Sequence, residues 1–375
     1  MACTRRQFLS RSLIAGAAGL VPGLLTASCA GVRRSDVHLK EKESLPDLMG
    51  LDRVRTDILY HASLAPSGHN AQPWTVRIGG DEWVIGLDPK RRLPAVDPEN
   101  RETLLSLGAF AENLFLAAGA YGFDAEMEVI AQHPDDADII RVLLKPTAPR
   151  EYPLERLRLR RTVRNGFLSG EILTSDIEAL SALLPGQLLY IPAGTPHADC
   201  IRDGAVEFFR QQAFRDAAQA ELVRWLRLDS ESALRHRDGL STAGMEIEGV
   251  AGWFVRSFVD PEDFMKTNFR QKGVDLTAKL AGEGAGWLII TSPGNSISDI
   301  VDTGRKFERM ALLAREKKIA IHPMSQFLEE EEGRNVIAMN HPPEMVPQFL
   351  LRVGYLATYP EPVSLRRPVG WFVRV

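Results

Sequence analysis

Cysteine is scarce in this chain of 375 residues, which contains only Cys3, Cys29 and Cys200. Three cysteines provide no disulfide framework, so stability must come from packing, and the chain is long enough to bury a large core. We expect Cys200 to be a small buried apolar residue. The formal net charge of −4 is also small, and it gives no reason to expect a nucleic-acid partner.

Acidic residues are absent before Asp36, and the chain starts with features of a targeting segment. Arg5 and Arg6 precede an apolar run over residues 13–27, a pattern that resembles a twin-arginine export signal. Pro22 interrupts that run, so the sequence does not favour a stable membrane-spanning helix there. A disordered basic tail is the alternative interpretation.

Cys29 ends the sequence LLTASC, which resembles the lipobox at which bacterial lipoproteins are cleaved and lipidated. Thr26 stands where leucine is usual, so cleavage at a nearby small residue is the alternative. We predict a signal peptide over residues 1–30 and a polar linker over 31–50. The protein is then exported, either periplasmic or membrane-anchored through Cys29 and facing the periplasm. The export signal implies the twin-arginine translocase as a partner. Because this translocase carries folded proteins, an exported protein can leave the cytoplasm with its cofactor already bound.

Two segments far apart in the chain repeat one pattern. GAFAENLFLAA from Gly108 and GRKFERMALLA from Gly304 share a glycine, a glutamate and an alanine at the same offsets. Their apolar residues fall on one helical stripe, which predicts a core helix in each copy. The apolar runs EWVIGLDP and GWLIITSP precede the two copies and predict strands. This order favours duplication over chance likeness, with one half over residues 51–150 and another over 151–375.

The second half contains a long insertion over residues 203–285. AVEFFRQQAFRDAAQAELVRWLRL predicts an amphipathic helix, and DGLSTAGMEIEGVAGW predicts a glycine-rich break. Both a lid over a site and ordinary packing helices fit this pattern. We expect Trp225 and Trp253, which lie in the insertion, to be core residues rather than residues that stack on a cofactor.

The segment APSGHNAQPW, residues 65–74, predicts a stiff loop rich in hydrogen-bonding groups. Its prolines fix φ, Gly68 permits conformations that other residues avoid, and its short polar side chains bond easily to nearby backbone. Such a loop suits a surface against a flat polar ligand, and it equally suits a helix-to-strand turn. We interpret His69 and His322 as hydrogen-bonded structural residues rather than proton donors.

Two arginine-rich segments could hold an anion. In LRLRRTVRNGF, Arg160, Thr162 and Arg164 alternate, so they share one face of an extended segment or meet at the start of a helix. Either arrangement collects cationic groups and a hydroxyl around one anion. Near the C-terminus, Arg366 and Arg367 precede an apolar strand pattern. A solvated basic surface is the alternative for both segments.

These segments together resemble a known family. APSGHNAQPW, RRTVRNGF, IAIHPMSQ and RVGYLATYPEPVSLRRP are similar to sequences of the nitroreductase superfamily of flavoproteins. The resemblance is greatest to its fused, internally duplicated branch associated with mycobacterial dormancy, in which an APS-x-HN-x-QPW loop and an RRT-x-R segment occur. DPENRETLLSLGA resembles that branch as well. The resemblance extends from about residue 51 to the end of the chain.

The resemblance implies an FMN site shared by the two halves. In that superfamily the cofactor lies at a subunit junction, with its phosphate held by one subunit and its ring covered by a loop of the other. Gln72 and Trp74 would anchor that loop. The implied FMN-binding residues are Pro66, Ser67 and Asn70 against the ring; Met324 and Ser325 near its reactive edge; and Arg160, Arg161, Thr162, Arg164, Arg366 and Arg367 around the phosphate and ribityl groups.

The resemblance also implies the fold. We expect an α+β protein whose two similar halves, each a mainly antiparallel sheet flanked by helices, pack as a pseudo-dimer within a monomer. The terminal strand WFVRV would pair with the first half. A second site would need an arginine-rich opening before the first half and a Pro-Ser loop in the second. LDRVRTDILYHASL has Arg53, Arg55 and Thr56 but not the full phosphate-binding set, and LLPGQLLYIPAGTPH lacks the loop, so we expect one FMN per chain.

The implied function is FMN-dependent oxidoreduction of a nitro, quinone or similar acceptor, with a small-molecule electron donor and acceptor as partners. The flavin carries the redox chemistry, so no catalytic side chain and no metal ligand is assigned. Two alternatives stay open. One is a protein that binds or sequesters FMN without turnover, and the other is a flavin-free structural relative.

Overall fold

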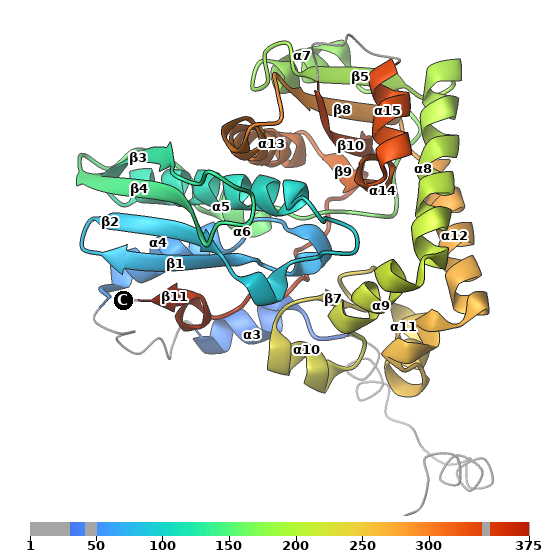
Figure 1. Cartoon of the computed structure of the whole chain (residues 1–375), viewed down its shortest axis with the longest axis horizontal. Coiled ribbons are helices and arrows are strands. Elements are labelled where there is room, and N and C mark those ends of the chain that lie inside the picture. Colours follow the sequence, from blue (N-terminus) through green and yellow to red (C-terminus); the bar gives the residue numbers. More distant parts are fainter. Residues whose placement is uncertain (1–30, 42–50, 340–345, 375) are drawn as a thin grey trace, which may run out of the picture.

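The computed structural model describes residues 31–41, 51–339 and 346–374, in which two sheets are joined and flanked by helices (Figure 1). The first sheet has the strand order β11–β1–β2–β4–β3 and is antiparallel except at β11. The second has the order β5–β8–β10–β9 and is antiparallel throughout. The α+β class predicted from the sequence is confirmed. The expected signal peptide lies outside the described residues.

The same succession of elements occurs in both parts of the chain. In the first part it runs α4 (Arg53–Ala62), β1 (Trp74–Gly79), β2 (Glu82–Leu87), α5 (Arg101–Ala120), β3 (Phe123–Val129) and β4 (Asp138–Pro146). After α6 (Glu155–Leu159), the second part runs α7 (Thr174–Ser181), β5 (Leu188–Pro192), β8 (Gly286–Ser292), α13 (Ile297–Glu316), β9 (Ile319–Pro323) and β10 (Val346–Tyr355). The strands predicted from EWVIGLDP and GWLIITSP are confirmed as β2 and β8.

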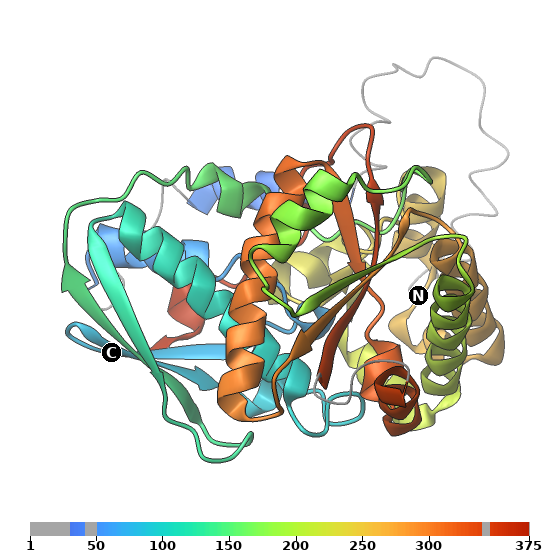
Figure 2. The same cartoon turned by 90° about the horizontal axis from the view of Figure 1, so that it is seen from above.

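Helices α5 and α13, both predicted as core helices, lie against each other between the two sheets (Figure 2). Two glycines allow the close crossing. A Cβ atom on Gly108 would lie 2.1 Å from the carbonyl oxygen of Val301, and one on Gly304 would lie 2.1 Å from that of Leu105. Gly304 follows Gly108 by the same number of residues as Val301 follows Leu105. Each helix therefore makes the same backbone contact with the other.

Local sequence explains where these elements begin. The β1–β2 hairpin turns at Gly80, whose φ of 66° favours glycine. Helix α13 starts with a capping box in which the Ser296 and Asp299 side chains each accept from the other's backbone N–H.

Among the described residues, α5 alone is long and apolar enough to cross a membrane. Most of this helix is buried in the hydrophobic core that packs against the first sheet.

The insertion separates β5 from β8, at the position where β1 and β2 are joined by a tight turn. The predicted amphipathic helix is two helices, α8 and α9, because the backbone of Arg215 is extended between them (φ −85°, ψ 111°). The expected glycine-rich break is only partly observed, because the last five residues of DGLSTAGMEIEGVAGW, from Gly249, form the first half of α11. The elements are α8 (Pro196–Phe214), α9 (Asp216–Trp225), β6 (Leu226–Arg227), α10 (Ser230–His236), β7 (Leu240–Ser241), α11 (Gly249–Phe258) and α12 (Thr267–Ala281).

Both ends of the described chain pack on the body of the molecule. Helix α3 (Arg34–Glu41) lies within the segment expected to be a linker, and its Val37 packs against Ala233 and Leu365. At the other end, β11 (Val373–Arg374) pairs in parallel with β1. The prediction that the terminal strand returns to the first half is confirmed.

Two predictions about burial are wrong. Cys200 is exposed, because the inner face of α8 is formed by Ala198, Ile201, Ala205 and Phe208 and Cys200 falls on the outer face. Trp253 is 39% exposed on α11, whose inner face is set by Gly252. Trp225 is buried as predicted, and the guanidinium groups of Arg91 and Arg227 lie 5.9 and 5.8 Å from its ring centroid.

Candidate functional site

The loop over residues 65–74 is held in a strained, fixed shape. His69, Asn70 and Gln72 all have φ near +50°, a conformation that costs non-glycine residues free energy. The loop contains a short 3-10 turn, Gly68–Asn70, and the Ser67 hydroxyl accepts a 2.9 Å hydrogen bond from the Gln72 N–H. The stiffness predicted from the sequence is present, and contacts outside the loop must stabilise it.

Those contacts come from the C-terminal segment. The Arg366 guanidinium donates to the carbonyl oxygens of Leu64 and Ala65 at 3.0 and 3.1 Å, and to Asn70 Oδ1 at 3.0 Å. The backbone N–H of Arg367 donates to Gln72 Oε1, and its guanidinium donates to the carbonyl oxygens of Gln72 and Trp74. Gln72 and Trp74 therefore anchor the loop as predicted, and Arg366 and Arg367 both meet it.

The segment after α6 forms neither helix nor strand from Arg160 to Arg164, and the backbone of Arg160 is extended (φ −62°, ψ 132°). Arg160 is 6% exposed, and its guanidinium makes no hydrogen bond to any other described residue. Its Nε lies 3.3 Å from Oε2 of Glu308 on α13, which is fully buried. Burial raises the pKa of Glu308, although the charge of Arg160 counteracts this. Arg160 is thus a buried cation whose donors are largely unused.

Positive charge accumulates around Arg160. Burial, followed by the nearby charges of Arg34 and Arg160, lowers the pKa of Arg366 well below its usual value. Burial also lowers the pKa of Arg34, to about 10. Tyr60 acts to raise this pKa, whereas the charges of Arg160 and Arg161 lower it further. Buried like charges repel strongly, and a bound anion would relieve that repulsion. The junction between the loop and the arginine-rich segment is therefore suited to an anionic group.

The other members of the arginine-rich segment contact the insertion. The carboxylate of Glu246 accepts from the Arg161 guanidinium at 2.8 Å and from the backbone N–H groups of Arg164 and Asn165 at 3.1 and 2.9 Å. The Arg164 guanidinium donates to the carbonyl oxygen of Gly244 at 2.7 Å. Thr162 is half-buried in the same segment. A carboxylate of the protein thus occupies part of the predicted anion grip.

The insertion also reaches the loop. Asn70 exchanges hydrogen bonds with the backbone of Gly239, and Gln72 Nε2 donates to the carbonyl oxygen of Arg237 at 2.9 Å. Residues 237–246 therefore touch both predicted parts of the site. Neither Glu246 nor Gly239 was identified from the sequence, because nothing in the local pattern shows which surface an insertion covers.

Met324 and Ser325 are placed differently from each other. The Met324 side chain is buried in the core beneath α8, together with Phe208 and Phe327. Ser325 precedes α14 (Gln326–Glu329) and lies within hydrogen-bonding reach of Glu102 at the start of α5. Oε2 of Glu102 is 3.4 Å from where a Cβ on Gly68 would stand. Ser325 therefore approaches the loop through Glu102, whereas the structure does not bring the Met324 side chain to the loop.

Glu102 and Glu329 form a partly buried acidic pair that was not predicted from the sequence. Burial raises the pKa of Glu329 well above its usual value, and the neighbouring Glu102 raises it further. Gln212 donates to Glu329 Oε2 at 2.6 Å. Because two neighbouring carboxylates with little access to water cannot both ionise easily, Glu329 is expected to lose its proton at a higher pH than an isolated glutamate does. The one signal in the sequence for Glu102 was its place in DPENRETLLSLGA, a segment that resembles the duplicated branch of the family.

Glu329→Gln is expected to change how stability depends on pH. Because the pKa of Glu329 is higher in the folded than in the unfolded protein, the protonated carboxyl contributes its full stability below about pH 4.5. This contribution to the free energy of unfolding is lost as the pH rises through the folded-state pKa. The glutamine variant cannot ionise, so it should be more stable than the natural chain by on the order of 1 kcal/mol at about pH 9. Urea unfolding across this range measures the difference. The exposed Glu331→Gln is the control, and parallel curves for all three chains would contradict the prediction.

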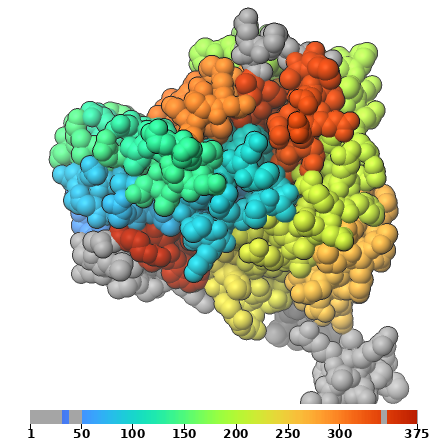
Figure 3. Space-filling view, viewed as in Figure 1, coloured from blue at the N-terminus to red at the C-terminus, as the bar shows by residue number. Residues whose placement is uncertain are grey.

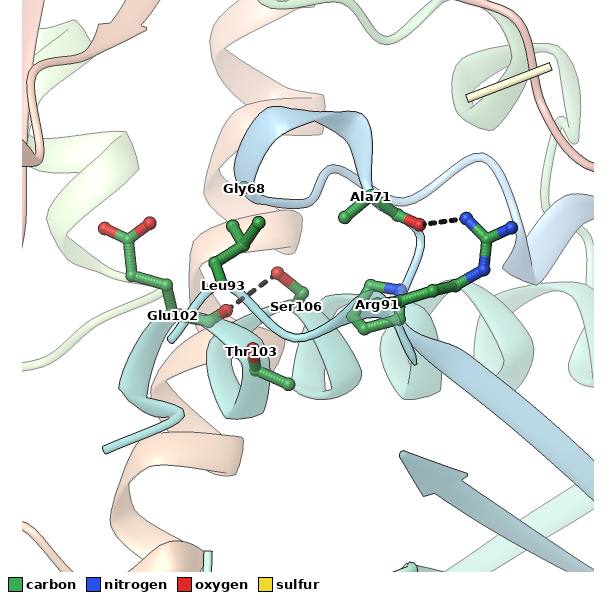
Figure 4. A pocket seen from close by; sticks show the side chains of 8 residues that line it. Gly68, Ala71, Arg91, Leu93, Glu102, Thr103 and Ser106 are labelled. Atoms are coloured by element: carbon green, nitrogen blue, oxygen red, sulfur yellow. Dashed lines mark hydrogen bonds between the residues drawn. The ribbon is translucent and has the colours of Figure 1, made fainter. Parts of the chain in front are cut away.

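The cavities described beside these residues are small. One of about 10 Å³ lies under the loop and is lined by Gly68, Arg91 and Glu102, among others (Figure 4). Another of about 100 Å³ lies beside Gly194 and Trp287, away from the loop. A pocket for a cofactor-sized ligand usually has roughly 300–1,000 Å³. Neither of these two cavities is large enough for such a ligand, and the cationic groups at the junction fit an anionic phosphate.

The histidines singled out from the sequence are both low-pKa groups. Burial lowers the pKa of His69 to about 4. Burial, followed by the charges of Arg164 and Arg352, lowers the pKa of His322 well below its usual value. Neither imidazole is therefore protonated at neutral pH. This supports the structural interpretation over a role as a cationic proton donor.

Fold and site together define an α+β protein with a buried cationic site where the loop of the first half meets the second half. No family model matches the chain. It is 25% identical over 339 residues to a Mycobacterium tuberculosis protein (strain ATCC 25618 / H37Rv) provisionally named NAD(P)H nitroreductase acg, covering 87% of this chain and 96% of that one. It is 23% identical over 324 residues to PigM of Serratia sp. (strain ATCC 39006), provisionally named an NAD(P)H nitroreductase, covering 78% and 86%. The chain is thus similar over most of its length to proteins named as nitroreductases.

Two solved structures are also similar to the chain. One is the FMN-dependent nitroreductase NfnB of Mycobacterium smegmatis in complex with NADPH, at 13% identity and a TM-score of 0.35, covering 54% of this chain and 86% of that chain. The other is a nitroreductase-like protein of Bacillus cereus, at 11% identity and a TM-score of 0.33, covering 61% and 98%. TM-scores this low carry no structural argument.

Proposed function

We propose that this protein is an FMN-dependent oxidoreductase of the nitroreductase type, which reduces a nitro, quinone or similar acceptor. The observation that carries the proposal is the buried guanidinium of Arg160, which lacks a hydrogen-bond partner among the described residues. A buried guanidinium whose one ionic partner is Glu308 and whose donors make no hydrogen bond is costly, and a phosphate would supply both charge and acceptors. The resemblance of the loop and of the arginine-rich segment to flavoproteins of the nitroreductase superfamily makes FMN the phosphate-bearing ligand that we propose.

The residues of this chain divide into those that would hold the phosphate and those that would face the ring. Arg160, Thr162, Arg164 and Arg366 would bind the phosphate and ribityl groups, with Arg161 and Arg367 beside them. Pro66, Ser67 and Asn70 would face the ring, with Ser325 near its reactive edge. The Met324 side chain is buried in the core away from the loop and is not assigned to the ring. When bound, the flavin supplies the electron transfer, and the protein contributes binding, orientation and hydrogen-bond donors.

The site is proposed to lie between two halves of an intramolecular pseudo-dimer, residues 51–150 and 151–375, with one FMN per chain. Two observations support this arrangement. The four strands β1–β2–β4–β3 have the same relative order as β5–β8–β10–β9. The α5–α13 crossing is made by equivalent glycines, Gly108 and Gly304.

Export is part of the proposal. Residues 1–30 would direct the protein to the twin-arginine translocase, and Cys29 would carry a lipid that anchors it to a membrane. The names of the relatives point to NAD(P)H as electron donor, yet reduced nicotinamides are scarce outside the cytoplasm. Adding NADPH, NADH or dithionite to the anaerobic protein and following flavin bleaching would identify the donor class.

A second function, binding or sequestering FMN without turnover, is favoured by the contacts of residues 237–246. They touch the loop at Asn70 and Gln72 and the arginine-rich segment at Arg161 and Arg164. A segment that bridges both parts of the site would keep acceptors away from a bound ring. Both functions require the cationic groups to bind FMN. They differ in whether an electron acceptor can reach the bound ring.

The visible absorption spectrum of the purified protein is expected to be that of a flavoprotein, and the released flavin is expected to be FMN. The reduced protein is then mixed anaerobically with a nitroaromatic compound or with buffer. Faster reoxidation by the nitroaromatic compound supports the reductase, and equal rates support storage. A colourless preparation that takes up no added FMN would contradict both.

A further inference from the structure

Helix α11 carries an exposed aromatic face. Val250, Phe254 and Phe258 follow one another at intervals of four residues and are 79%, 53% and 40% exposed. Trp253 lies beside this stripe, and its ring is 5.4 Å from that of Phe258. Contiguous exposed apolar groups of this size mark an interaction surface on a soluble protein. We call these four side chains the α11 face.

The orientation of α11 is fixed by its opposite side. A Cβ on Gly252 would stand 2.3 Å from the carbonyl oxygen of Ile247, so the helix packs closely on the preceding chain. Ring contacts of Phe258 with both Phe254 and Trp253 hold the face together. The helix lies at the lower edge of the molecule, among the helices of the insertion (Figures 1 and 3). The α11 face is therefore a preformed outer surface.

The described chain begins beside this helix. A Cβ on Gly31 would lie 3.1 Å from Thr242 Oγ1 and 3.3 Å from an Arg256 Nη1 atom of α11. Arg33 forms a 3.3 Å ion pair with Glu248, which immediately precedes α11. Cys29 is two residues before Gly31, and two residues span at most about 7 Å. A lipid on Cys29 would thus be tethered within about 7 Å of residues that contact α11 on its Gly252 and Arg256 side.

We propose that the α11 face docks on the interfacial region of a lipid bilayer, an inference that rests on the proposed membrane attachment at Cys29. Tryptophan and phenylalanine side chains partition into this region, where apolar area is buried. Asp260 follows the helix and is exposed, and the chain is net negative. Docking is therefore driven by apolar burial and not by anionic lipids. The membrane would lie against the insertion, with the first sheet directed away from it.

Brominated lipids test this inference in the full chain. Four of the six tryptophans, Trp74, Trp83, Trp225 and Trp287, are buried, and only Trp253 and Trp371 are substantially exposed. Trp371→Phe leaves Trp253 as the one exposed indole, and Trp253→Phe leaves Trp371. Each variant is mixed with phosphatidylcholine vesicles whose acyl chains carry bromine or hydrogen. Sedimentation of the vesicles measures attachment separately from quenching.

We expect brominated vesicles to remove most of the Trp253 emission in Trp371→Phe and little emission in Trp253→Phe. Adding Val250→Ser and Phe254→Ser to Trp371→Phe should abolish most of that quenching, because these side chains are exposed and tolerate replacement. Leu173→Ser with Leu276→Ser, exposed at 63% and 49% elsewhere, should not change it.

Three outcomes would overturn the inference. Sedimentation with the vesicles without Trp253 quenching would leave the attachment standing but remove α11 from it. Absence of both sedimentation and quenching would overturn the attachment as well. A dimer whose mass falls on Val250→Ser, again without quenching, would assign the α11 face to a second copy of the chain. Flavin content is measured on the same samples, so failure of the FMN proposal is detected independently.

Discussion

Replacing both Arg160 and Arg164 with alanine is expected to give a folded protein that retains little flavin. Charge-assisted hydrogen bonds to a phosphate each contribute about 1.5–3 kcal/mol. Loss of two such contacts should weaken FMN binding by about two orders of magnitude or more. Released flavin per mole of protein, and titration of the stripped protein with FMN, measure the effect.

The structure explains why this variant should fold. Arg160 has no hydrogen bond to another described residue, and removal of the Arg164 side chain breaks one hydrogen bond, to the carbonyl oxygen of Gly244. The cost falls on Glu308, which would lose its nearest cation, but its pKa is already raised by burial and it can take up a proton. Adding Glu308→Gln to the double variant removes this cost and keeps the experiment interpretable if the double variant is unstable.

Arg158→Ala is the matched control for this prediction. Arg158 belongs to the same basic run, but its side chain is 39% exposed and pairs with Glu155. Its removal should leave flavin content unchanged if binding depends on the buried arginines and not on the charge of the run. Equal flavin in the natural chain and in the Arg160→Ala/Arg164→Ala variant would rule out this segment as the phosphate site.

The elements that could be predicted from the sequence are those defined by local periodicity. The apolar stripes of α5 and α13 and the apolar runs of β2 and β8 are visible without knowledge of their neighbours. The loop over residues 65–74 was also predictable, because proline, glycine and asparagine act locally. The return of β11 to β1 followed from the family resemblance, not from any feature of WFVRV itself.

The contacts that complete the site could not be predicted because they join residues far apart in the sequence. Glu246 meets Arg161 across the insertion, and Glu102 meets Glu329 across the two halves. Burial of a single residue on an amphipathic helix also depends on which face packs. The predictions that Cys200 and Trp253 are buried were wrong for that reason. The type of a residue indicates its average burial but not which face of a helix it occupies.

Gly108→Ala is expected to be among the most destabilising single substitutions in the chain. The added Cβ would stand 2.1 Å from the carbonyl oxygen of Val301 and 3.1 Å from the backbone nitrogen of Arg305. Both are main-chain atoms of α13, so no side chain can move aside and the two helices must separate. Forced separation in a packed core costs about 3 kcal/mol or more. Urea unfolding followed by circular dichroism measures the loss.

Gly304→Ala provides the test of equivalence between the two halves. Its Cβ would meet the Leu105 carbonyl oxygen at the same 2.1 Å, so a symmetric crossing predicts a loss of similar size. Gly273→Ala on α12 is the control, since its Cβ would make an ordinary 3.6 Å contact with Phe209. There, alanine should stabilise the helix by about 0.5–1 kcal/mol. If Gly108→Ala behaved like Gly273→Ala, α5 and α13 would not cross at their glycines, and a site assembled across that crossing would lose its framework.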